Sequence, residues 1–588
     1  MNEQFSYIER MEKMMDDDAK DMLRRIWEPT VVATPLSDAR RDLCVLPSGE
    51  IRMYGYPYTE HAHTPEGPCV FLSSVDGGIS WTKHYSKGKM NSCTYIEAGK
   101  VYLAPYESKT VFGIKRSFIG PDDPNPEIIV ICEENGAHHF DSFLPIKSEF
   151  SDRIWMTSQK FYVNSEGKNA HTAVFCYSDD FGKTWTKREI EEPTREEVIY
   201  PHKSLRWCYG SGTEPHAVEL SKGKLMMIIR TPHDFFYLSY SDDGGDSWSR
   251  AEPSTFYGTD TTAYLLRLSD GRVLTFWNNT KPLSQPNYKV ERNRVSEWVS
   301  AGKGENAFTN RDAAHVAISS DGGKTFFGYR ELILNPIRDR RDFRYFGGVK
   351  QTLDKSVHQF QALELPLGKI LVTVGQNTEA RRAVIFDIGW LLEKERSEDF
   401  VQNGISQLTT HTYAKSFSDH TADTAGNGHC SWNRAPSAYL LPDPDGSTAE
   451  VLSISKHHDE RLYNDIGGAV WNFPCSKRGR VEVVIKIAEK SARISLSDRW
   501  YNTCDPHITA FVPFTFDIEA EDVGEGYVTL SIDYDTERAR AAVAINGEHL
   551  FALRMAHPVP TGISYLHMQC ATDGDSDGFY IKSLKKTV

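Results

Sequence analysis

Ser241-Asp-Asp243-Gly-Gly245-Asp-Ser247-Trp248 is one of four copies of the pattern Ser-x-Asp-x-Gly-x-Ser/Thr-aromatic. The other copies occupy residues 74–81, 178–185 and 319–326, and each copy follows an apolar run typical of a β-strand. In such a turn the Asp can accept backbone N–H groups, the Gly adopts a positive φ, and the aromatic residue packs under the next repeat unit. The pattern predicts a hairpin turn. Four copies in order predict repeated strand–turn units, as in a propeller or a solenoid.

These four segments are Asp-boxes, and residues 30–390 resemble the sialidase-like (BNR-repeat) superfamily of glycoside hydrolases. The resemblance implies a six-bladed β-propeller. It also places the Asp-boxes on the outer rim, far from the central pocket of a propeller. The Asp-boxes therefore indicate the fold, and the chemistry has to be argued from other residues.

Six segments independently show an apolar run, a turn and a second apolar run. They are residues 43–53, 94–103, 143–157, 217–227, 264–274 and 362–372. Six such hairpins predict six blades. The spacing of the Asp-boxes agrees, since the interval from Asp76 to Asp180 fits two blades and each later interval fits one.

A chain of 588 residues is too long for a single core, so we expect two large domains and an all-β fold. Residues 3–25 have helical spacing and predict an N-terminal helix within 1–28, ahead of a propeller over 29–390. Residues 391–403 should form a linker helix that closes the propeller. Residues 404–588 alternate apolar and polar side chains and predict a β-sandwich of jelly-roll type, resembling lectin-like sandwiches. This second domain either buttresses the propeller or binds sugar.

The formal net charge of −14 argues against nucleic acid and anionic membrane surfaces as partners. No apolar run is long enough for a membrane span, and the first residues lack the pattern of a signal peptide, so we expect a cytoplasmic location. The ten cysteines contain no CxxC pair and are expected to be buried free thiols. No metal or cofactor motif is complete, so no cofactor is expected. The sequence leaves the oligomeric state open.

The resemblance implies three arginines that grip a substrate carboxylate, a Glu and a Tyr that form the nucleophile, and an Asp that moves the proton. Guanidinium groups suit a carboxylate because they bind it with two parallel hydrogen bonds. Residues 212–230 resemble a family strand pair, which assigns Glu214 as the partner of the nucleophile and Arg230 as the second arginine. The plainer alternative is an exposed strand end at Arg230 and a turn residue at Glu214.

The other two arginines are assigned by position. Arg311 precedes the fourth Asp-box, as the third arginine of the family does, although a surface ion pair with Asp312 is the alternative. The first arginine is expected at the opening strand of the first blade, where either Arg40 or Arg41 could match and Arg41 is preferred.

The sequence departs from the family at the nucleophile. Gln359 stands where the family has its Tyr, and a glutamine can neither titrate nor attack. The adjacent His358 could act as a general acid or base, or could be structural; on a strand it would face away from the Gln359 side. Glu60 lies in the loop where the acid/base Asp is expected. Trp207 and residues 276–279 look like sugar-stacking platforms.

Together these residues predict a glycoside hydrolase that releases a terminal acidic sugar, sialic-acid-like or uronic, from a glycan. Two alternatives stay open. One is a propeller glycosidase or polysaccharide lyase that uses a His base, and the other is a glycan-binding protein without catalysis.

Overall fold

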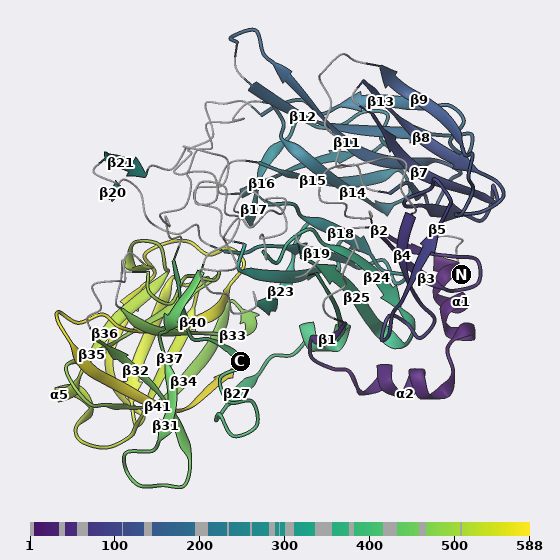
Figure 1. Ribbon diagram of the computed structural model, residues 1–588. Helices are drawn as coiled ribbons and strands as arrows, with labels where there is room; N and C mark the ends of the chain where they lie inside the picture. Colours follow the sequence, from purple (N-terminus) through teal and green to yellow (C-terminus); the bar gives the residue numbers. More distant parts are fainter. Residues whose placement is uncertain are drawn as a thin grey trace.

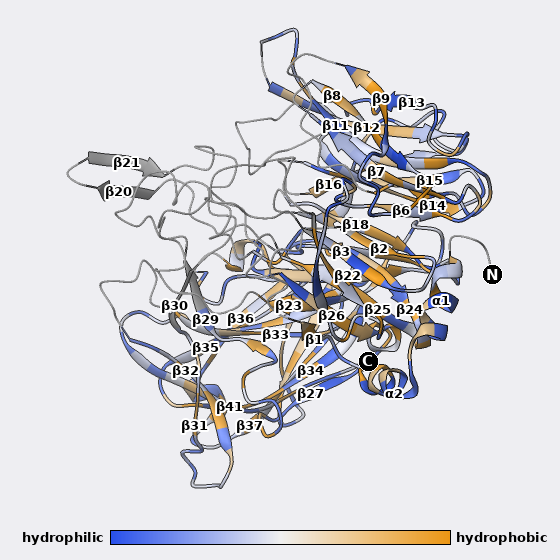
Figure 2. Cartoon of the chain, turned by 45° about the vertical axis from the view of Figure 1, so that its right-hand side comes forward, coloured by the Kyte–Doolittle hydropathy of each residue, from blue (hydrophilic) through white to orange (hydrophobic). Residues whose placement is uncertain are grey.

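The computed structural model describes residues 5–33, 42–55, 69–108, 110–133, 144–167, 169–193, 210–231, 235–258, 261–280, 288–292, 295–299, 311–334, 356–375, 381–414, 432–457, 466–505 and 508–588. Within them, a ring of small sheets lies beside a pair of larger sheets (Figure 1). Hydrophobic residues concentrate on the strands of both domains (Figure 2). The all-β class, with a propeller followed by a sandwich, is confirmed.

Six four-stranded antiparallel sheets form the ring in the described part of the chain, and each has one of the six expected hairpins as its first two strands. The first three blades are β2 (Asp42–Val45), β3 (Ile51–Gly55), β4 (Cys69–Ser74) and β5 (Thr82–Ser86); β6 (Thr94–Ile96), β7 (Val101–Glu107), β8 (Val111–Ser117) and β9 (Glu127–Glu133); and β10 (Ile146–Lys147), β11 (Ile154–Val163), β12 (Asn169–Ser178) and β13 (Thr186–Glu189).

The last three blades complete the ring. They are β14 (Thr213–Ser221), β15 (Lys224–Arg230), β16 (Phe235–Ser241) and β17 (Glu252–Tyr257); β18 (Tyr264–Arg267), β19 (Val273–Trp277), β22 (Ala313–Ser319) and β23 (Phe327–Leu334); and β24 (Gln361–Leu365), β25 (Lys369–Val374), β26 (Arg382–Asp387) and β1 (Thr30–Ala33). Because β1 pairs with β26, placing Thr30 opposite Ile385, the amino-terminal strand completes the sixth blade and closes the ring. A small hairpin, β20 (Tyr288–Arg292) and β21 (Val295–Val299), lies between β19 and β22 in the chain.

The alternation of strand direction gives the ring two faces. The Asp-box face carries the turns between the third and fourth strands of each blade. The loop face carries the start of each first strand and the end of each second strand, as at Thr213 and Arg230, which lie opposite each other. Residues at the two ends of one inner strand therefore face different sides of the ring.

Each Asp-box is a turn held by its own side chains. In the third box, Ser241 Oγ donates to Asp243 Oδ1 at 2.8 Å, the Gly245 N–H donates to Ser241 Oγ at 2.9 Å, and the Ser247 N–H donates to Asp243 Oδ1 at 2.9 Å. Burial acts against ionisation, but hydrogen bonds from Ser247 and Ser241 bring the pKa of Asp243 down to about 2. Gly245 has the expected positive φ of 95°.

The expectation that the aromatic residue of each box packs under the next blade is wrong, because it packs on the preceding one. Trp248 of the fourth blade lies with its ring centroid 4.9 Å from that of Phe175 in the third blade. A Cβ on Gly245 would come within 2.2 Å of the same Phe175 ring. Which neighbouring blade the aromatic residue contacts depends on how the two twisted sheets overlap, and the periodicity of a strand does not encode that overlap.

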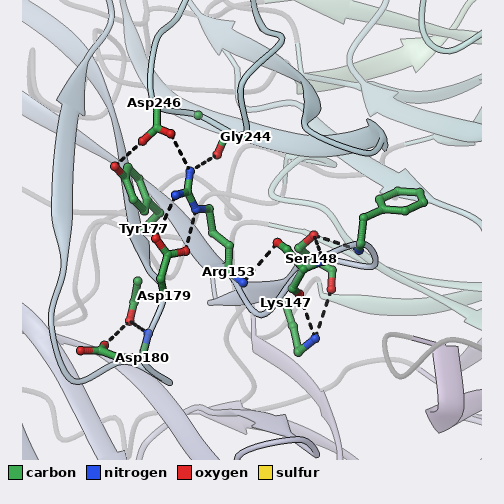
Figure 3. Close-up of polar contacts among 12 residues, drawn as sticks. Lys147, Ser148, Arg153, Tyr177, Asp179, Asp180, Gly244 and Asp246 are labelled. Atoms are coloured by element: carbon green, nitrogen blue, oxygen red, sulfur yellow. Dashed lines mark hydrogen bonds and ion pairs between the residues drawn. The ribbon is translucent and has the colours of Figure 1, made fainter.

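Arg153 joins two Asp-boxes across the third and fourth blades (Figure 3). Its guanidinium donates to both carboxylate oxygens of Asp179 at 2.8 and 2.9 Å and to the Gly244 carbonyl at 2.9 Å. It also stacks over the Tyr177 ring at 3.9 Å. Two of the four expected turns thus take part in a direct contact between neighbouring blades.

The single amino-terminal helix expected within 1–28 is two helices, α1 (Ser6–Met14) and α2 (Asp17–Arg25). The chain becomes extended at Met15, and the Asp16 carboxylate then caps α2 by accepting the Ala19 N–H at 2.8 Å. An Asp at this position favours a new helix start over continuation of the first, which a periodicity argument overlooks.

The linker helix expected over 391–403 is also corrected. Only one turn of helix, α3 (Ile388–Leu391), is present in this region, capped where the Asp387 side chain accepts the Gly389 N–H. The chain then forms the short strand β27 (Arg396–Glu398), which pairs with the last strand of the second domain. Strand pairing with β41 supplies the backbone hydrogen bonds that a longer helix would have satisfied internally.

The second domain is a two-sheet sandwich with its core between the sheets. One sheet has the order β31 (Tyr439–Pro442), β32 (Glu450–Lys456), β41 (Ser576–Thr587), β34 (Arg478–Ile487), β37 (Val528–Asp535), β38 (Arg540–Ile545) and β39 (Glu548–Arg554), with β27 beside β41. The other has β28 (Leu408–Thr409), β33 (Gly467–Ser476), β40 (Ile563–Cys570), β35 (Ser491–Ser497) and β36 (Phe514–Glu519). A separate hairpin joins β29 (His411–Ala414) and β30 (Trp432–Pro436), and α5 (Ala520–Val523) follows β36.

A buried polar network fastens the sandwich to the fifth blade. Tyr565 Oη donates to Glu331 Oε2 at 2.8 Å and lies 2.6 Å from His315 Nε2. Since the Asn279 N–H donates to His315 Nδ1, the proton of this imidazole is on Nε2 and points at Tyr565. Burial lowers the pKa of His315 to about 3 and raises the pKa of Glu331 to about 7, despite the hydrogen bond from Tyr565.

We predict that Gly245→Ala destabilises the propeller more than Gly322→Ala. Both glycines have positive φ, so both alanines are strained, but only the Cβ at 245 collides with a neighbouring blade, whereas position 322 has open space. Overpacking costs about 1–3 kcal/mol beyond the backbone strain. Urea unfolding of the two variants measures the difference; equal losses would show that the close approach to Phe175 is unimportant.

We also predict a pH-dependent stability from Glu331. In the unfolded chain this carboxyl ionises above about pH 4.5, but in the folded protein only above about pH 7, because it is buried. The folded state binds the extra proton in that window, so the free energy of unfolding should fall as pH rises from 4.5 to 7, by at most about 1.4 kcal/mol per pH unit. Glu331→Gln should lose this slope in thermal melts, whereas the same slope in both proteins would contradict the assignment.

Candidate functional site

A cavity of about 200 Å³ lies on the propeller axis. All six first strands, β2, β6, β10, β14, β18 and β24, contribute to its wall. Phe5, Tyr7 and Arg10 of the amino-terminal segment line the same cavity, and Arg10 Nη1 reaches Glu97 at the end of β6 with a 3.0 Å ion pair. Burial raises the pKa of Tyr7 far above its usual value. The α1 segment thus closes the Asp-box end of the cavity.

Glu214 and Arg230 meet at the loop face of the fourth blade. Arg230 Nη1 lies 2.5 Å from Glu214 Oε2, and the side chains are 10% and 8% exposed. The register of β14 against β15 shifts between Thr213 and His216, which turns Glu214 toward the end of β15. The structure therefore brings together the two residues that were expected to act together. Both side chains are largely buried, unlike the exposed strand end that the alternative predicts for Arg230.

The backbone around Glu214 is shaped for this contact. Glu214 has a left-handed φ of 43°, and its N–H donates to Gln159 Oε1 at 2.5 Å. Gly212 has a φ of 114°, and a Cβ there would lie 2.4 Å from the Arg230 carbonyl oxygen. A left-handed non-glycine residue costs about 1–3 kcal/mol and is concentrated at functional sites.

Arg311 lies just before β22 in the fifth blade and is only 1% exposed. Its Nη1 lies 2.9 Å from His358 Nε2, and since a guanidinium can only donate, Nε2 is the acceptor. The proton of the imidazole is then on Nδ1, which lies 2.9 Å from Ser356 Oγ. The burial of Arg311 and Asp312 argues against the expected alternative of a surface ion pair.

His358 is not part of a strand, because β24 begins at Gln361. Gln359 has a left-handed φ of 60°, so the chain turns between His358 and the strand. The strand alternation expected at this point does not apply, and His358 packs onto Arg311. Glu214 and Gln359, both assigned to the site from sequence, are thus both left-handed residues at the loop face.

Asn278 joins the segments that carry Arg311 and His358, although the sequence suggested a sugar-stacking role. Its Nδ2 donates to the Ala313 carbonyl at 2.6 Å and to the Val357 carbonyl at 2.9 Å. The platform expected over 276–279 is wrong, since Phe276 and Trp277 are fully buried in the propeller core. An alternating strand pattern cannot tell an aromatic core face from an exposed one when both faces of a blade are covered.

Two positioning residues were missed by sequence reasoning. Gln159 of β11 accepts the Glu214 N–H and also contacts the Thr213 hydroxyl, and Ser356 contacts His358. Neither belongs to a recognisable motif, and only their contacts reveal them. In the second domain Trp471 lies in the core of the sandwich and Trp500 packs with Ala313 of the fifth blade, and both are fully buried.

Arg41, Glu60 and Trp207 lie outside the described residues, so their assignments stay predictions. Within the described ranges, no cluster of three His, Cys, Asp or Glu side chains could hold a metal ion. No helix in this part of the chain is long and apolar enough to cross a membrane.

We predict that Asn278→Ala destabilises the protein by about 1–3 kcal/mol, because two buried carbonyl groups lose their donor. Asn403→Ala is the control, since that amide is exposed and makes a single 3.2 Å contact with Glu398. Urea unfolding compares the two variants, and a loss at Asn278 no larger than at Asn403 would contradict a bracing role.

Comparison with known proteins found one family match, a curated relative and several solved structures. Residues 144–345 match the family model described as a BNR repeat-like domain. An anhydrosialidase from Macrobdella decora is 29% identical over 140 residues, which cover 22% of this chain and 16% of that relative's length. A Trypanosoma rangeli sialidase solved with the inhibitor DANA is 11% identical and covers 94% of this chain and 92% of its own, with a TM-score of 0.34.

A Dyadobacter fermentans protein of unknown function is 16% identical over 62% of this chain and 99% of its own, with a TM-score of 0.38. The family match falls on the third to fifth blades, which carry three of the four Asp-boxes, the Glu214–Arg230 pair and Arg311. The chain thus carries a BNR repeat-like domain over residues 144–345, within a ring of six four-stranded sheets in the described part of the chain.

Proposed function

We propose that this protein is a sialidase-like glycoside hydrolase that removes a terminal acidic sugar, sialic-acid-like or uronic, from a glycan. The observation that carries the proposal is the pair of buried arginines, Arg230 and Arg311, on neighbouring blades at one face of the ring. The family match and the anhydrosialidase relative support the same class of chemistry.

The two arginines suit a carboxylate because each is already oriented by the protein. Arg230 is held by Glu214, and one nitrogen of Arg311 is committed to His358. A guanidinium that is fixed before binding loses little freedom when it grips an anion. Arg41 would supply the third guanidinium from the first blade.

Glu214 would stabilise the positive charge that develops on the sugar ring during cleavage. Two residues were expected to manage the proton. His358 has its Nε2 lone pair occupied by Arg311, which favours a positioning role for His358 and leaves proton transfer to Glu60. Gln359 and Trp207 would contact the sugar.

One specific observation favours a second candidate, a glycan-binding protein without catalysis. Gln359 stands where the family has its nucleophilic Tyr, and its amide cannot form a glycosyl intermediate. Tight sugar binding with no product after long incubation would support that alternative.

We predict that Arg230→Lys and Arg311→Lys each lower kcat/KM by about tenfold or more on the responsive substrate, because an ammonium group cannot form the paired hydrogen bonds of a guanidinium. The substrate is first found by screening aryl glycosides of sialic, uronic and neutral sugars. Arg153→Lys, which alters the rim contact of Figure 3, is the matched control and should keep full activity.

Thermal melts must show that each variant is folded. Unchanged turnover in folded Arg230→Lys and Arg311→Lys would eliminate the carboxylate assignment. An unsaturated product with ultraviolet absorbance, in place of a free sugar, would instead indicate a lyase.

A further inference from the structure

Two thiols meet where the first and second blades join near the propeller axis. Cys44 lies on β2, and Cys93 directly precedes β6. Their sulfur atoms are 3.4 Å apart, and both cysteines are free and buried, with exposures of 4% and 0%. They come from positions 49 residues apart in the chain, so the fold brings them together.

Both thiols belong to one apolar cluster with Phe71 and Met90. Cys44 is also one of the residues that line the axial cavity, whereas Cys93 is not. A water molecule occupies about 30 Å³, so the cavity of about 200 Å³ admits molecules of that size. Hydrogen peroxide is only slightly larger than water, so it can enter the cavity beside Cys44.

We propose that Cys44 and Cys93 are a peroxide-oxidised thiol pair, in which Cys44 reacts first and Cys93 resolves the product as a disulfide. The Cys44 sulfur attacks one peroxide oxygen, the O–O bond breaks, and a sulfenic acid and one water form. The Cys93 sulfur then attacks the Cys44 sulfur, the S–O bond breaks, and a second water leaves. Two thiols and one hydrogen peroxide thus give one disulfide and two waters.

The geometry allows this step with small movements. The sulfur atoms must approach by about 1.4 Å, from 3.4 Å to a bond length of about 2.05 Å. The disulfide would join the first strands of two adjacent blades. Because the Leu43 N–H already donates to Gln361 Oε1 at 2.6 Å, β2 would then be tied to both of its neighbours in the ring.

The surroundings determine how fast the pair reacts. The hydrogen bond with Cys93, together with burial, raises the pKa of the Cys44 thiol well above its usual value. Only the thiolate attacks peroxide, so oxidation should be slow at neutral pH and about tenfold faster for each pH unit of increase. The pair is therefore suited to sustained oxidative exposure and not to rapid signalling.

The test treats the native full-length protein with hydrogen peroxide, removes the peroxide with catalase, and alkylates the remaining thiols in denaturant. We expect the treated protein to have two fewer alkylated thiols than the untreated protein, and a Cys44–Cys93 linked peptide in the digest. Dithiothreitol should restore both thiols, and the oxidised protein should melt at a higher temperature because the crosslink restrains the unfolded chain.

Cys44→Ser and Cys93→Ser should abolish the linked peptide, and Cys93→Ser should instead accumulate higher oxides on Cys44. Cys570→Ser, which removes another buried thiol in the sandwich, should leave the linkage intact. If a serine variant fails to fold, the linked peptide of the wild type still decides the matter. Full alkylation of Cys44 and Cys93 after peroxide, or sulfinic acid on Cys44 without a linkage in the wild type, would overturn the proposal.

Discussion

The pairing of β1 with β26 is the contact on which the propeller depends. Without β1 the sixth blade has three strands, and its outer edge is left without a partner. A blade buries its faces only against its neighbours, so an incomplete ring exposes apolar surface at the gap. Closure of the ring fixes the positions of the side chains at the axis, because the first strand of each blade is held between the first strands of the two neighbouring blades. The buried contacts of α1 and α2 with the first and sixth blades strengthen the same junction.

The loop face shows how a regular scaffold holds irregular residues. Glu214 and Gln359 have left-handed backbones that repeated β-structure does not supply. The surrounding contacts hold them in place. Gln159 accepts the Glu214 N–H, and Asn278 donates to one carbonyl group next to Arg311 and to another next to His358. Left-handed residues also occur in turns of the Asp-box face, at Phe181 and Leu367, so the loop face is distinguished by the side chains that it places beside its strained backbone.

Most of the fold could be predicted from the sequence, because its signals are local. The Asp-box turn and the six hairpins each need only adjacent residues, and they fix the class and the number of blades. The break between α1 and α2 also has a local signal at Asp16, which a search for helical periodicity passes over. The packing of Trp248 on the preceding blade has no local signal in the sequence, because it depends on how two separate sheets overlap.

The candidate site was less predictable, because much of it depends on contacts between residues that lie far apart in the sequence. The pairing of Glu214 with Arg230 could be inferred because residues 212–230 resemble a strand pair of the family, and the two residues lie on one hairpin. The contact between Arg311 and His358 joins two blades, and the role of Asn278 depends on two carbonyl groups from different segments. Long-range contacts of this kind leave no pattern in a single sequence.

The closure of the axial cavity by α1 limits how a polymer could use the ring. A tunnel open at both ends allows a chain to be threaded and advanced by successive steps. Here Phe5 and Tyr7 line the cavity at the end that α1 closes, so a chain cannot be threaded through the ring in this direction. Any molecule in the axial cavity therefore has to enter and leave by a route other than the Asp-box end.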